Sequence, residues 1–495
     1  MPAVEITGRN DMSDFKGSSF RWGVRSRKPM CRQMSKDWRS AMAAMVMASA
    51  SILLVAQRAS ADDPSSASSG FLQTKLGGLN LTFGGKAGLG YVATGNTNFG
   101  DGFRDRGKSV DHDVDYGEGF VEPRLDLDYQ TEKYGEFYGA VAAIGAQTIG
   151  GDPGGYTSHS PNDVSVGQLF AGWKSGDLLS SSFGKDALTV SGGRQDFHIG
   201  DGFLVWDGNF DAGGDGAYWL APRTAFDNTT IVTLNTGPVH ADTFYLKSDK
   251  DNDHSELAGT NVEYHKDGFG TLGATYFNIF DSDDKLYIRN GMNVASMRVS
   301  DIKIPSVDGL TVRGEYAREW GGRNGIKTDA YGWYAEIDYS LASYLPWSPT
   351  LSYRYSAFSG DSNPDNKTNT SFDPLFFGAG RGWGTWYQGE IVGEYLLFNS
   401  NNRVNTVQLN VKPADSLSTG LIYFNFSLDK GNYGGSSVKS KSFANEVDLY
   451  ADWSVNDHLY MGAVGGIGFA GAAAKQAFGN NDVYQLAEFI MTVTY

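Results

Sequence analysis

The chain has 495 residues, among them 26 Tyr, 29 Phe, 64 Gly and a single Cys, and its net charge is −16. Apart from one stretch near the N-terminus, no apolar run approaches the roughly 20 residues that a membrane-spanning helix needs, so a helical membrane protein is excluded. A transmembrane β-barrel is permitted, because lipid-facing and lumen-facing residues alternate there and mean hydropathy stays low.

Residues 1–61 predict a cleaved signal peptide. A basic segment, the apolar run 41–56 and the Ala-Ser-Ala motif at 59–61 correspond to its n-region, h-region and cleavage site. The basic segment is long, and a start at Met34 would give an ordinary leader. Cleavage would remove Cys31 and leave 31 basic (41 − 10) and 53 acidic (57 − 4) residues, a net charge of −22. The mature chain then has neither a disulfide nor a cysteine ligand or nucleophile.

The last residues of the chain favour a transmembrane barrel over a secreted β-sandwich or propeller. Apolar and polar residues alternate up to a C-terminal aromatic residue. The apolar face consists of Ala487, Phe489, Met491, Val493 and Tyr495. This pattern is similar to the C-terminal recognition signal of bacterial outer-membrane barrels, and it places the end of the last strand in the periplasm.

Counting back from this end predicts an all-β fold, a single transmembrane antiparallel β-barrel of 18 strands over residues 80–495. The count rests on the short periplasmic turns and longer external loops of such barrels. Residues 62–79 are Ser-rich and predict a flexible periplasmic segment before the barrel domain. The predicted strands are 80–92, 118–130, 136–147, 164–174, 187–194, 228–235, 239–247, 257–265, 271–280, 294–304, 309–318, 330–341, 350–358, 403–412, 417–428, 442–453, 459–470 and 483–495.

Long external loops are expected at 93–117, 195–227 and 360–402. Residues 383–398 could instead form a strand, but the residues before them would then become a long periplasmic connection, against the rule for such barrels. We therefore prefer the loop. The four-residue spacing of its acidic and apolar side chains predicts a short amphipathic helix over 386–398, folded over or into the pore.

Charged residues occupy one parity of the predicted strands and apolar residues the other. A charge facing lipid costs up to about 2–4 kcal/mol at mid-membrane, so the charged parity must face an aqueous lumen. The residues predicted to line it are Arg124, Asp126, Arg298, Arg313, Glu315, Glu336, Asp338, Arg354, Glu446 and Asp448. Aromatic residues near strand ends predict interfacial girdles, for example Tyr344, Trp347, Trp453 and Tyr460.

Two segments resemble a known family. The stretch 372–391 combines aromatic residues and glycines with Arg381, and the motif 193–195, Gly-Arg-Gln, ends a predicted strand shortly before Gly-Asp-Gly at 200–202. Both resemble elements of the alginate export family, whose members are outer-membrane β-barrels that pass a polysaccharide or a related solute. The resemblance implies a channel in the outer membrane of a Gram-negative bacterium.

The segment around Arg381 suits a carboxylated sugar. Aromatic faces can stack on sugar rings, and a guanidinium binds a carboxylate through two parallel hydrogen bonds. Trp383 and Trp386 could equally form a girdle or the core of a loop. In that case Arg381 would pair with Glu390 or Asp373.

Arg194 has a pore-facing, substrate-contacting role if the resemblance holds. It shares the parity of Leu188 and Val190, the lipid face, so the strand is expected to end or bulge there and place Arg194 at the outer rim. The alternative is an arginine that braces Asp201 or Asp207. The full set of candidate substrate-binding or pore residues is Arg124, Arg194, Gln195, Asp201, Arg223, Arg298, Arg313, Glu315, Arg354, Arg381, Trp383, Trp386 and Glu390.

The charge of −22 does not fit an exporter of an anionic polysaccharide, for which a basic pore is expected. Two transport functions therefore stay open: a channel of the alginate-export type for a polysaccharide or a small anionic or sugar solute, and an uptake porin for organic acids or oligosaccharides. Enzyme and metal motifs are weak, because the histidines are scattered and the calcium-like start at 249–253 lacks the Gly and Glu of such a loop. No cofactor, metal or enzymatic activity is expected.

The expected partners follow from this interpretation. Outer-membrane lipid and lipopolysaccharide would surround the barrel, and a polysaccharide or small anionic solute would pass through it. An exporter would also meet periplasmic export components. We expect a monomer and no contact with nucleic acid.

Overall fold

The computed structural model describes residues 72–103, 111–155, 160–209, 212–249, 254–283, 288–323, 325–363, 366–378 and 380–495. The predicted signal peptide, residues 1–61, lies outside the described residues, as do residues 62–71 of the predicted flexible segment. Within the described ranges, no helix is both long enough and apolar enough to cross a membrane.

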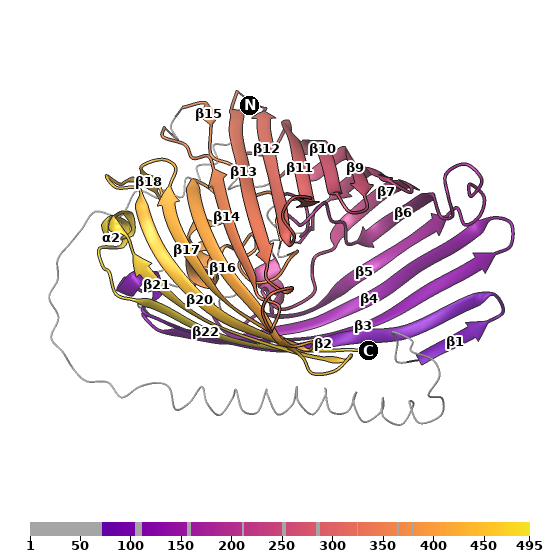
Figure 1. The fold of residues 1–495 in the computed structure, drawn as a ribbon, viewed down its shortest axis with the longest axis horizontal. Coiled ribbons are helices and arrows are strands. Elements are labelled where there is room, and N and C mark those ends of the chain that lie inside the picture. The colour runs from indigo at the N-terminus through magenta and orange to yellow at the C-terminus, as the bar shows by residue number, and fades with distance from the viewer. Residues whose placement is uncertain are drawn as a thin grey trace, which may run out of the picture. The chain divides into compact units, whose positions relative to one another are not determined.

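Antiparallel strands form a closed β-barrel (Figure 1). Neighbouring strands pair in chain order, and the last, β22, pairs with the first barrel strand, β2, which closes the ring. The 18 barrel strands are β2 (Leu79–Gly95), β3 (Val114–Thr131), β4 (Gly135–Gly150), β5 (Asn162–Lys174), β6 (Leu188–Gln195), β7 (Phe226–Thr236), β8 (Val239–Lys247), β9 (Glu256–Lys266), β10 (Gly270–Asp281), β11 (Met292–Lys303), β12 (Leu310–Gly321), β13 (Lys327–Ser340), β14 (Thr350–Phe358), β16 (Asn402–Ala414), β17 (Leu417–Leu428), β20 (Ser442–Ser454), β21 (Leu459–Ala470) and β22 (Tyr484–Thr494).

Shorter elements lie before the first barrel strand and in the connections between strands. They are β1 (Leu72–Leu76), η1 (Thr97–Gly100), η2 (Ala212–Asp215), β15 (Thr368–Asn369), η3 (Gly389–Leu397), β18 (Asn432–Tyr433), β19 (Ser436–Ser437) and α2 (Ala472–Phe478). The 18-stranded all-β barrel predicted from the sequence is confirmed, with strand ends that differ by a few residues. The element α2 falls in a connection for which the sequence predicted only a loop.

β1 also departs from the sequence-based expectation. It lies in the segment predicted to be flexible, yet it forms a hairpin with β2 in which Leu72 pairs with Phe83 and Leu76 with Leu79. The same edge of β2 pairs further along with β22, and the backbone of Gly85 exchanges hydrogen bonds with that of Tyr495. β1 therefore continues the sheet just beyond the C-terminus.

The two parities of each wall strand meet different surroundings. On β12 and β13, the lumen-facing Glu315 and Glu336 are only 5% and 4% exposed, whereas the outward-facing Tyr316 and Ile337 are 50% and 49% exposed. An apolar outer face suits lipid, and a polar inner face suits an aqueous lumen. The alternation read from the sequence thus sets which residues can reach the interior.

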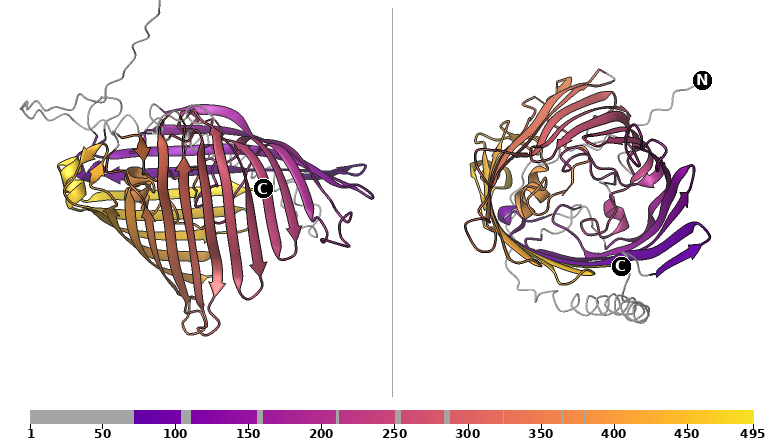
Figure 2. Two further views of the ribbon diagram at one scale, coloured as in Figure 1. Left: turned by 90° about the horizontal axis from the view of Figure 1, so that it is seen from above. Right: turned by 45° about the vertical axis from the view of Figure 1, so that its right-hand side comes forward.

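Two long loops, 196–225 and 359–401, fold into the barrel, where Figure 2 shows them inside the ring of strands. Their apolar side chains are buried against the inner wall, and Trp386 is completely covered. One cluster joins both loops to strands β7 to β14. Its loop members are Phe197, Ile199, Phe203, Leu204, Val205, Phe372, Leu375, Phe376, Phe377 and Trp386.

A second cluster joins η3 to the opposite part of the wall and explains strand β17. Both parities of β17 are apolar: Leu421 and Tyr423 are exposed on the outer face, and Ile422 and Phe424 are 1% and 0% exposed on the inner face. A wall strand needs two apolar faces only where protein covers its lumen side. Loop 359–401 supplies that cover.

The predicted helix over 386–398 is present, but as a π-helical segment, η3. Left-handed residues flank it, Gln388 with φ 39° and Phe398 with φ 45°. Position 393 must be Gly, because a Cβ there would lie 2.0 Å from the Tyr387 carbonyl oxygen. The alternative of a strand over 383–398 is wrong.

One of the predicted girdle residues also lies elsewhere. Tyr344, Trp347 and Trp453 are 64%, 61% and 47% exposed. Tyr460 instead shares the lumen-facing parity, and its hydroxyl donates a hydrogen bond to Asp452 at 2.5 Å. Its polar tip thus has a partner inside the barrel, which a girdle position would not supply.

Candidate functional site

Glu336 on β13 is the centre of an ion-pair network on the inner wall. Arg381, from loop 359–401, donates to both of its carboxylate oxygens, at 2.6 and 3.1 Å. Arg313 of β12 and Arg354 of β14 reach the same carboxylate at 3.1 and 3.4 Å. β12 and β14 flank β13 in the sheet, and Arg313 and Arg354 lie directly opposite Glu336. The regular alternation of the strands therefore points all three side chains into the lumen at the same place.

Arg381 also links the two inward-folded loops. Its Nε lies 3.0 Å from Oδ2 of Asp201, in loop 196–225, and that oxygen accepts a hydrogen bond from the Tyr334 hydroxyl at 2.9 Å. Burial lowers the pKa of the Arg381 guanidinium, but its bonds to Glu336 and Asp201 outweigh this and raise the pKa above the usual range. Arg381 is therefore a permanent cation held between two loops and the wall.

The remaining wall arginines extend this network along the strands. Arg298 of β11 donates to Thr275 at 2.8 Å and also binds Asn261 and Glu263, so it spans three strands. Arg313 additionally binds Asp338 and Asp301. The inner wall thus carries an arginine on each of β11, β12 and β14, and each is matched with a carboxylate.

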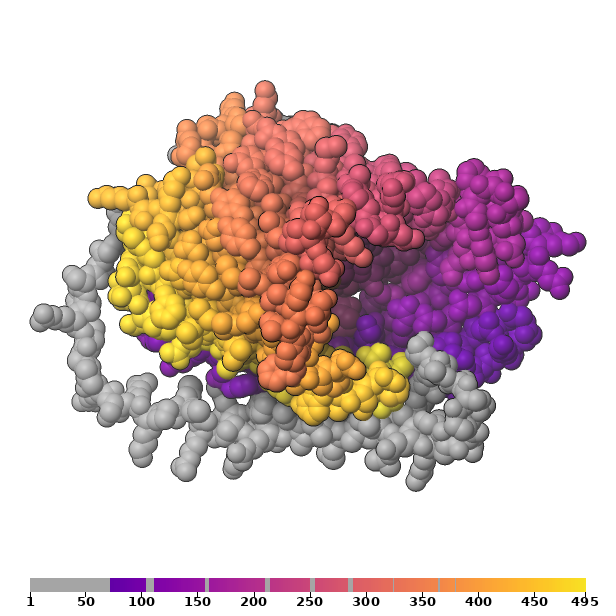
Figure 3. All heavy atoms as spheres, viewed as in Figure 1, coloured from indigo at the N-terminus to yellow at the C-terminus, as the bar shows by residue number. Residues whose placement is uncertain are grey.

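Exposure separates the arginines that can meet a solute from those that cannot. The side chains of Arg298 and Arg354 are 2% and 6% exposed, whereas Arg313 and Arg381 are each 23% exposed and Arg124 is 31% exposed. The space-filling view shows a recess between parts of the first and middle thirds of the chain (Figure 3). Exposed guanidinium groups can bind carboxylates through paired hydrogen bonds.

The structure places Arg194 of the Gly193-Arg194-Gln195 element at the end of β6, with its side chain turned away from the lumen. The β6–β7 register shifts between Gly193 and Gln195, as the predicted bulge requires. Arg194 keeps the outward parity of Val190. It pairs with Asp227 at 3.2 Å and with Asp249, so the predicted pairing with Asp201 or Asp207 is wrong.

Two other candidates are internal braces. Gln195 donates to Ser191 at 3.1 Å and to Thr229 at 2.6 Å, both on the inner wall. Arg223, only 5% exposed, binds backbone carbonyls of its own loop, at Asp215 (3.1 Å) and Gly216. Both side chains hold the fold of loop 196–225 and its base.

The two candidate tryptophans have different surroundings. Trp386 is 0% exposed, with the Phe203 and Tyr334 rings at 5.0 and 4.6 Å, so it belongs to the loop core and is not a platform for sugars. Trp383 is partly exposed, and its Nε1 donates to Asp452 at 2.8 Å. Only Trp383 is placed to stack on a solute.

A polar and aromatic patch surrounds Trp383, and the sequence did not predict its other members. Asp452 accepts bonds from Trp383 and Tyr460, and the Tyr450 hydroxyl accepts bonds from Gln408 and Asn410 at 2.9 and 2.7 Å. These residues share the lumen-facing parity of β16, β20 and β21. That parity was the available signal, but aromatic residues near strand ends suggested a girdle instead.

Loop 359–401 has a second attachment to the wall, through η3. The carboxylate of Glu446 on β20 accepts the amide N–H groups of Ile391 and Val392 at 2.8 and 2.7 Å. Asp448 accepts the amide of Glu390 at 3.3 Å. Glu390 is 6% exposed and does not contact Arg381, so the predicted pairing of these two is wrong, as is the pairing of Arg381 with Asp373.

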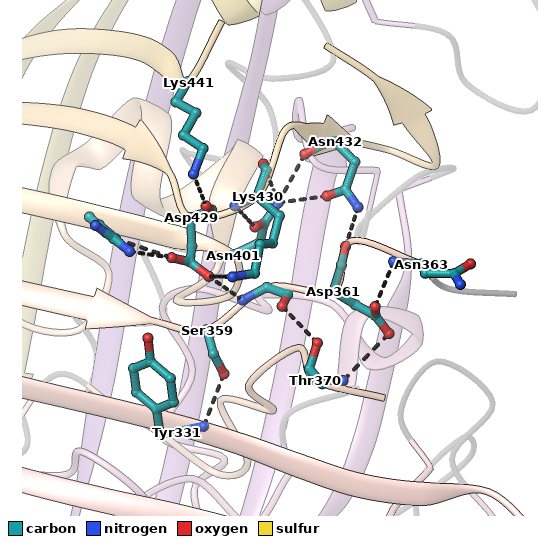
Figure 4. A network of polar contacts seen from close by, with 12 residues as sticks. Tyr331, Ser359, Asp361, Asn363, Thr370, Asn401, Asp429, Lys430, Asn432 and Lys441 are labelled. Carbon is teal, nitrogen blue, oxygen red and sulfur yellow. Dashed lines mark hydrogen bonds and ion pairs between the residues drawn. The ribbon is translucent and has the colours of Figure 1, made fainter. Parts of the chain in front are cut away.

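The ends of this loop are fastened at the rim, as Figure 4 shows. Asp429, 2% exposed, accepts hydrogen bonds from the Gly360 amide at 3.1 Å and from Arg403 at 2.6 Å, and it pairs with Lys430 at 3.2 Å. Asn401 accepts the Lys430 amide at 2.7 Å and donates to Asn432. Burial opposes ionisation of Asp429, but these donors and cations outweigh it and lower its pKa.

Comparisons with known proteins agree with this architecture. The sequence profile of the family described as "Alginate export" matches residues 104–487. No curated protein sequence matches significantly. Among the described residues, no group of His, Cys, Asp or Glu is arranged to hold a metal ion.

Several solved structures share the fold at low sequence identity. Pseudomonas aeruginosa OpdQ is 12% identical with a TM-score of 0.52, over 84% of this chain and 97% of that one. Pseudomonas aeruginosa OccK5 (OpdH) is 9% identical with a TM-score of 0.54, over 83% and 98%. A BenF-like porin from Pseudomonas fluorescens Pf-5 is 9% identical with a TM-score of 0.51, over 84% and 98%.

Proposed function

Because this chain belongs to the alginate export family and forms a porin-like barrel of the outer membrane, we propose that it conducts anionic solutes, above all carboxylated sugars, through an arginine-lined lumen. The observation that supports this most is the group of arginines at the inner wall, where Arg313 of β12 and Arg381 of loop 359–401 stay partly exposed. Each has carboxylate neighbours, so a passing carboxylate would exchange one partner for another. Such binding is weak enough to permit release, as conduction requires.

Loops 196–225 and 359–401 bear on the size of the solute. Their shared apolar core occupies part of the lumen and is anchored to both sides of the wall. A narrowed lumen favours short or single-unit solutes over a folded or branched polymer. We therefore include uptake of small organic acids or oligosaccharides as the second candidate, and treat the two loops as the elements that gate either path.

Planar-bilayer recording tests the proposal. The folded protein should give stepwise currents with a reversal potential that indicates anion preference. Arg381→Ala should shift that potential toward cations, because it removes a charge and frees the carboxylates of Glu336 and Asp201. Lys133→Ala, which removes an exposed cation from the turn between β3 and β4, is the matched control and should shift it little.

Block of the current identifies the solute class. Small uronates and organic acids should reduce the conductance more than neutral sugars of the same size, and Trp383→Ala should weaken block by sugars only. Equal block by neutral and acidic sugars would contradict the proposed role of the arginines. Absence of any current from correctly folded protein would contradict the channel itself.

A further inference from the structure

Five carboxylates meet where η3 packs on the wall. The members are Glu390 and Glu394 of η3, Glu446 and Asp448 of β20, and Glu488 of β22. Glu390 and Glu394 are each 6% exposed, and Glu446 and Asp448 are 0% and 1% exposed. The charged groups that act most strongly on Glu390 and Glu394 are other members of this acidic cluster.

The hydrogen-bond donors that reach the acidic cluster are backbone amides: those of Ile391 and Val392 on Glu446, and that of Glu390 on Asp448. Ionising a buried carboxylate that has too few donors is costly, and protonation removes that cost. Within the described structure, Oδ1 of the buried Asp448 and the hydroxyl of the buried Tyr484 also have no hydrogen-bond partner.

In the described part of the chain, the strands β3, β21 and β22 present no positive charge to η3. β3 contributes Tyr116, whose hydroxyl lies 3.0 Å from that of Tyr395, with the acidic Glu118 beyond it. β22 contributes Tyr484 and Glu488, and Asp152 acts on both Tyr116 and Tyr484 from a neighbouring loop. β21 presents Gly466 and Gly468 to Ile391. Loop 196–225 packs on Tyr395 through Trp219, and its cation, Arg223, acts on Glu118. The charged groups that act on Glu390 and Glu394 themselves are acids.

We propose that η3 is a proton-operated latch: it docks on the wall while the acidic cluster is protonated, and it leaves the wall and widens the lumen when the cluster ionises. The inference rests on the proposed channel function. Ionising several buried carboxylates without a counter-ion is costly, and like charges a few ångströms apart add to that cost. Undocking removes both costs by exposing the carboxylates to lumen water.

The direction of the pH effect follows from the titration of η3. Burial, reinforced by the neighbouring acids, raises the pKa of Glu390 and of Glu394 well above the usual carboxyl range. The docking energy is therefore fully present below the usual carboxyl pKa and is lost as the pH rises through the raised pKa of the docked state. The docked form is the acid form, and the wide form prevails at higher pH.

The rest of loop 359–401 can stay in place while η3 moves. Its ends are fastened by Asp429 and Asn401 at the rim, and Arg381 holds its middle to Glu336. Asp429 and Glu336 each pair with a cation, and Asn401 is a neutral amide, so none of these attachments requires a protonated carboxyl group. The latch is thus limited to the segment that includes η3.

The test is conductance of the mature protein in planar bilayers between acid and mildly alkaline pH. Wild-type conductance should rise by about twofold or more with pH, in step with the wider lumen. The double variant Glu390→Gln/Glu394→Gln should stay near the acid level throughout, because it cannot ionise on η3. Glu132→Gln, which alters an exposed carboxylate in a periplasmic turn, should keep the wild-type response.

A cross-link supplies a second, independent constraint. A Cβ at position 468 would lie 3.6 Å from the Ile391 side chain and meet no closer atom than 3.5 Å, so Ile391→Cys/Gly468→Cys suits a disulfide in the docked state. No other cysteine is present in the mature chain as predicted. The oxidised protein should lose the rise with pH, and reduction should restore it.

A spin label on Leu396→Cys reports the position of η3 without any current. Its spectrum should show an immobile label at acid pH and a mobile one at alkaline pH. A conducting pore with no pH response, or a response that the double variant and the cross-link leave intact, would overturn the latch and leave the channel function standing. Loss of all current at every pH, with the label still changing mobility, would instead overturn the channel function.

Discussion

Loop 359–401 is held to the barrel wall at two places that differ in charge. On the β12–β14 side, three arginines surround one carboxylate, Glu336, and a second carboxylate completes the group. On the β20–β22 side, five carboxylates meet with no cation among the described residues, and backbone N–H groups satisfy only part of them. The same loop therefore has one attachment that ionisation strengthens and one that ionisation weakens.

This difference shows that a lumen-facing charge does not by itself identify a solute site. Glu336 and Glu446 have the same parity, the same burial and the same residue type. Their roles diverge because of what the loop presents to each: a guanidinium from Arg381 or a row of amide groups from η3. The loop, more than the wall, decides which charges can meet a solute.

The largest effect is expected from Trp386, the apolar anchor beside the Glu336 attachment. Trp386→Ala should lower the unfolding free energy by about 3–5 kcal/mol, because it leaves a large cavity between the two loops and the wall. Urea titration in lipid vesicles, followed by protease resistance, measures this. Trp383→Ala, at a partly exposed position, is the control and should cost far less. Equal costs would mean that the loop core is not built around Trp386.

Exchanging single carboxylates for amides separates the two attachments directly. Glu336→Gln should lower the unfolding free energy by about 2–3 kcal/mol at neutral pH, because it breaks the ion pairs of a buried carboxylate. The cost is not larger, because Arg313 and Arg381 are partly exposed and solvent screens their charges. The isosteric Glu446→Gln should cost less at neutral pH, because it also removes repulsion from the acidic cluster. Urea titrations at one pH compare the two. A larger cost for Glu446→Gln would reverse the comparison.

The stability of the loop-end attachment at Asp429 should depend on pH in the opposite direction to the docking of η3. The pKa of Asp429 is lowered, so its stabilisation is present above the usual carboxyl pKa and disappears as the pH falls through its lowered value. Asp429→Asn should cost about 1–2 kcal/mol at neutral pH and less in acid. Proteolysis of the loop ends measures the effect. Asp415→Asn, in an exposed periplasmic turn, should change nothing.

Arg194→Ala should have the smallest effect. Its pair with Asp227, which is 45% exposed, is screened by solvent and contributes less than about 1 kcal/mol. Its pair with Asp249, in which both side chains are 13% exposed, is the larger part of a total cost of about 1 kcal/mol. Because the side chain has the outward parity, the reversal potential should stay unchanged, in contrast to Arg381→Ala. A shift as large as that of Arg381→Ala would return Arg194 to the solute path.

Most of the barrel could be predicted from the sequence, because membrane and lumen impose a two-residue alternation on every strand. The C-terminal alternation ending at Tyr495 fixed the sidedness, and the turn lengths fixed the count. β1 was not predicted, because it is only five residues long and has no lipid-facing run of its own. Its pairing is decided by the free edge of β2, which local sequence does not report.

The interior could be predicted only in part. The alternation of the strands identified Glu336, Arg313 and Arg354 as lumen residues. Arg381 reaches its partners only because loop 359–401 folds back into the barrel, and no rule of residue spacing predicts such a contact. One signal was overlooked: Ile422 and Phe424 are apolar at lumen positions of a strand whose outer face is also apolar. Such a strand indicates that protein covers the lumen side.

The placement of β1 has a consequence for how the barrel closes. A strand can slip along its neighbour only in steps of two residues, since a single step would turn its apolar face inward. A two-residue slip of β22 toward the start of β2 would bring Tyr495 opposite Phe83, which already pairs with Leu72. The β1–β2 hairpin is therefore a mechanical stop for the final strand, and it sets the register at the seam where the two ends of the sheet meet.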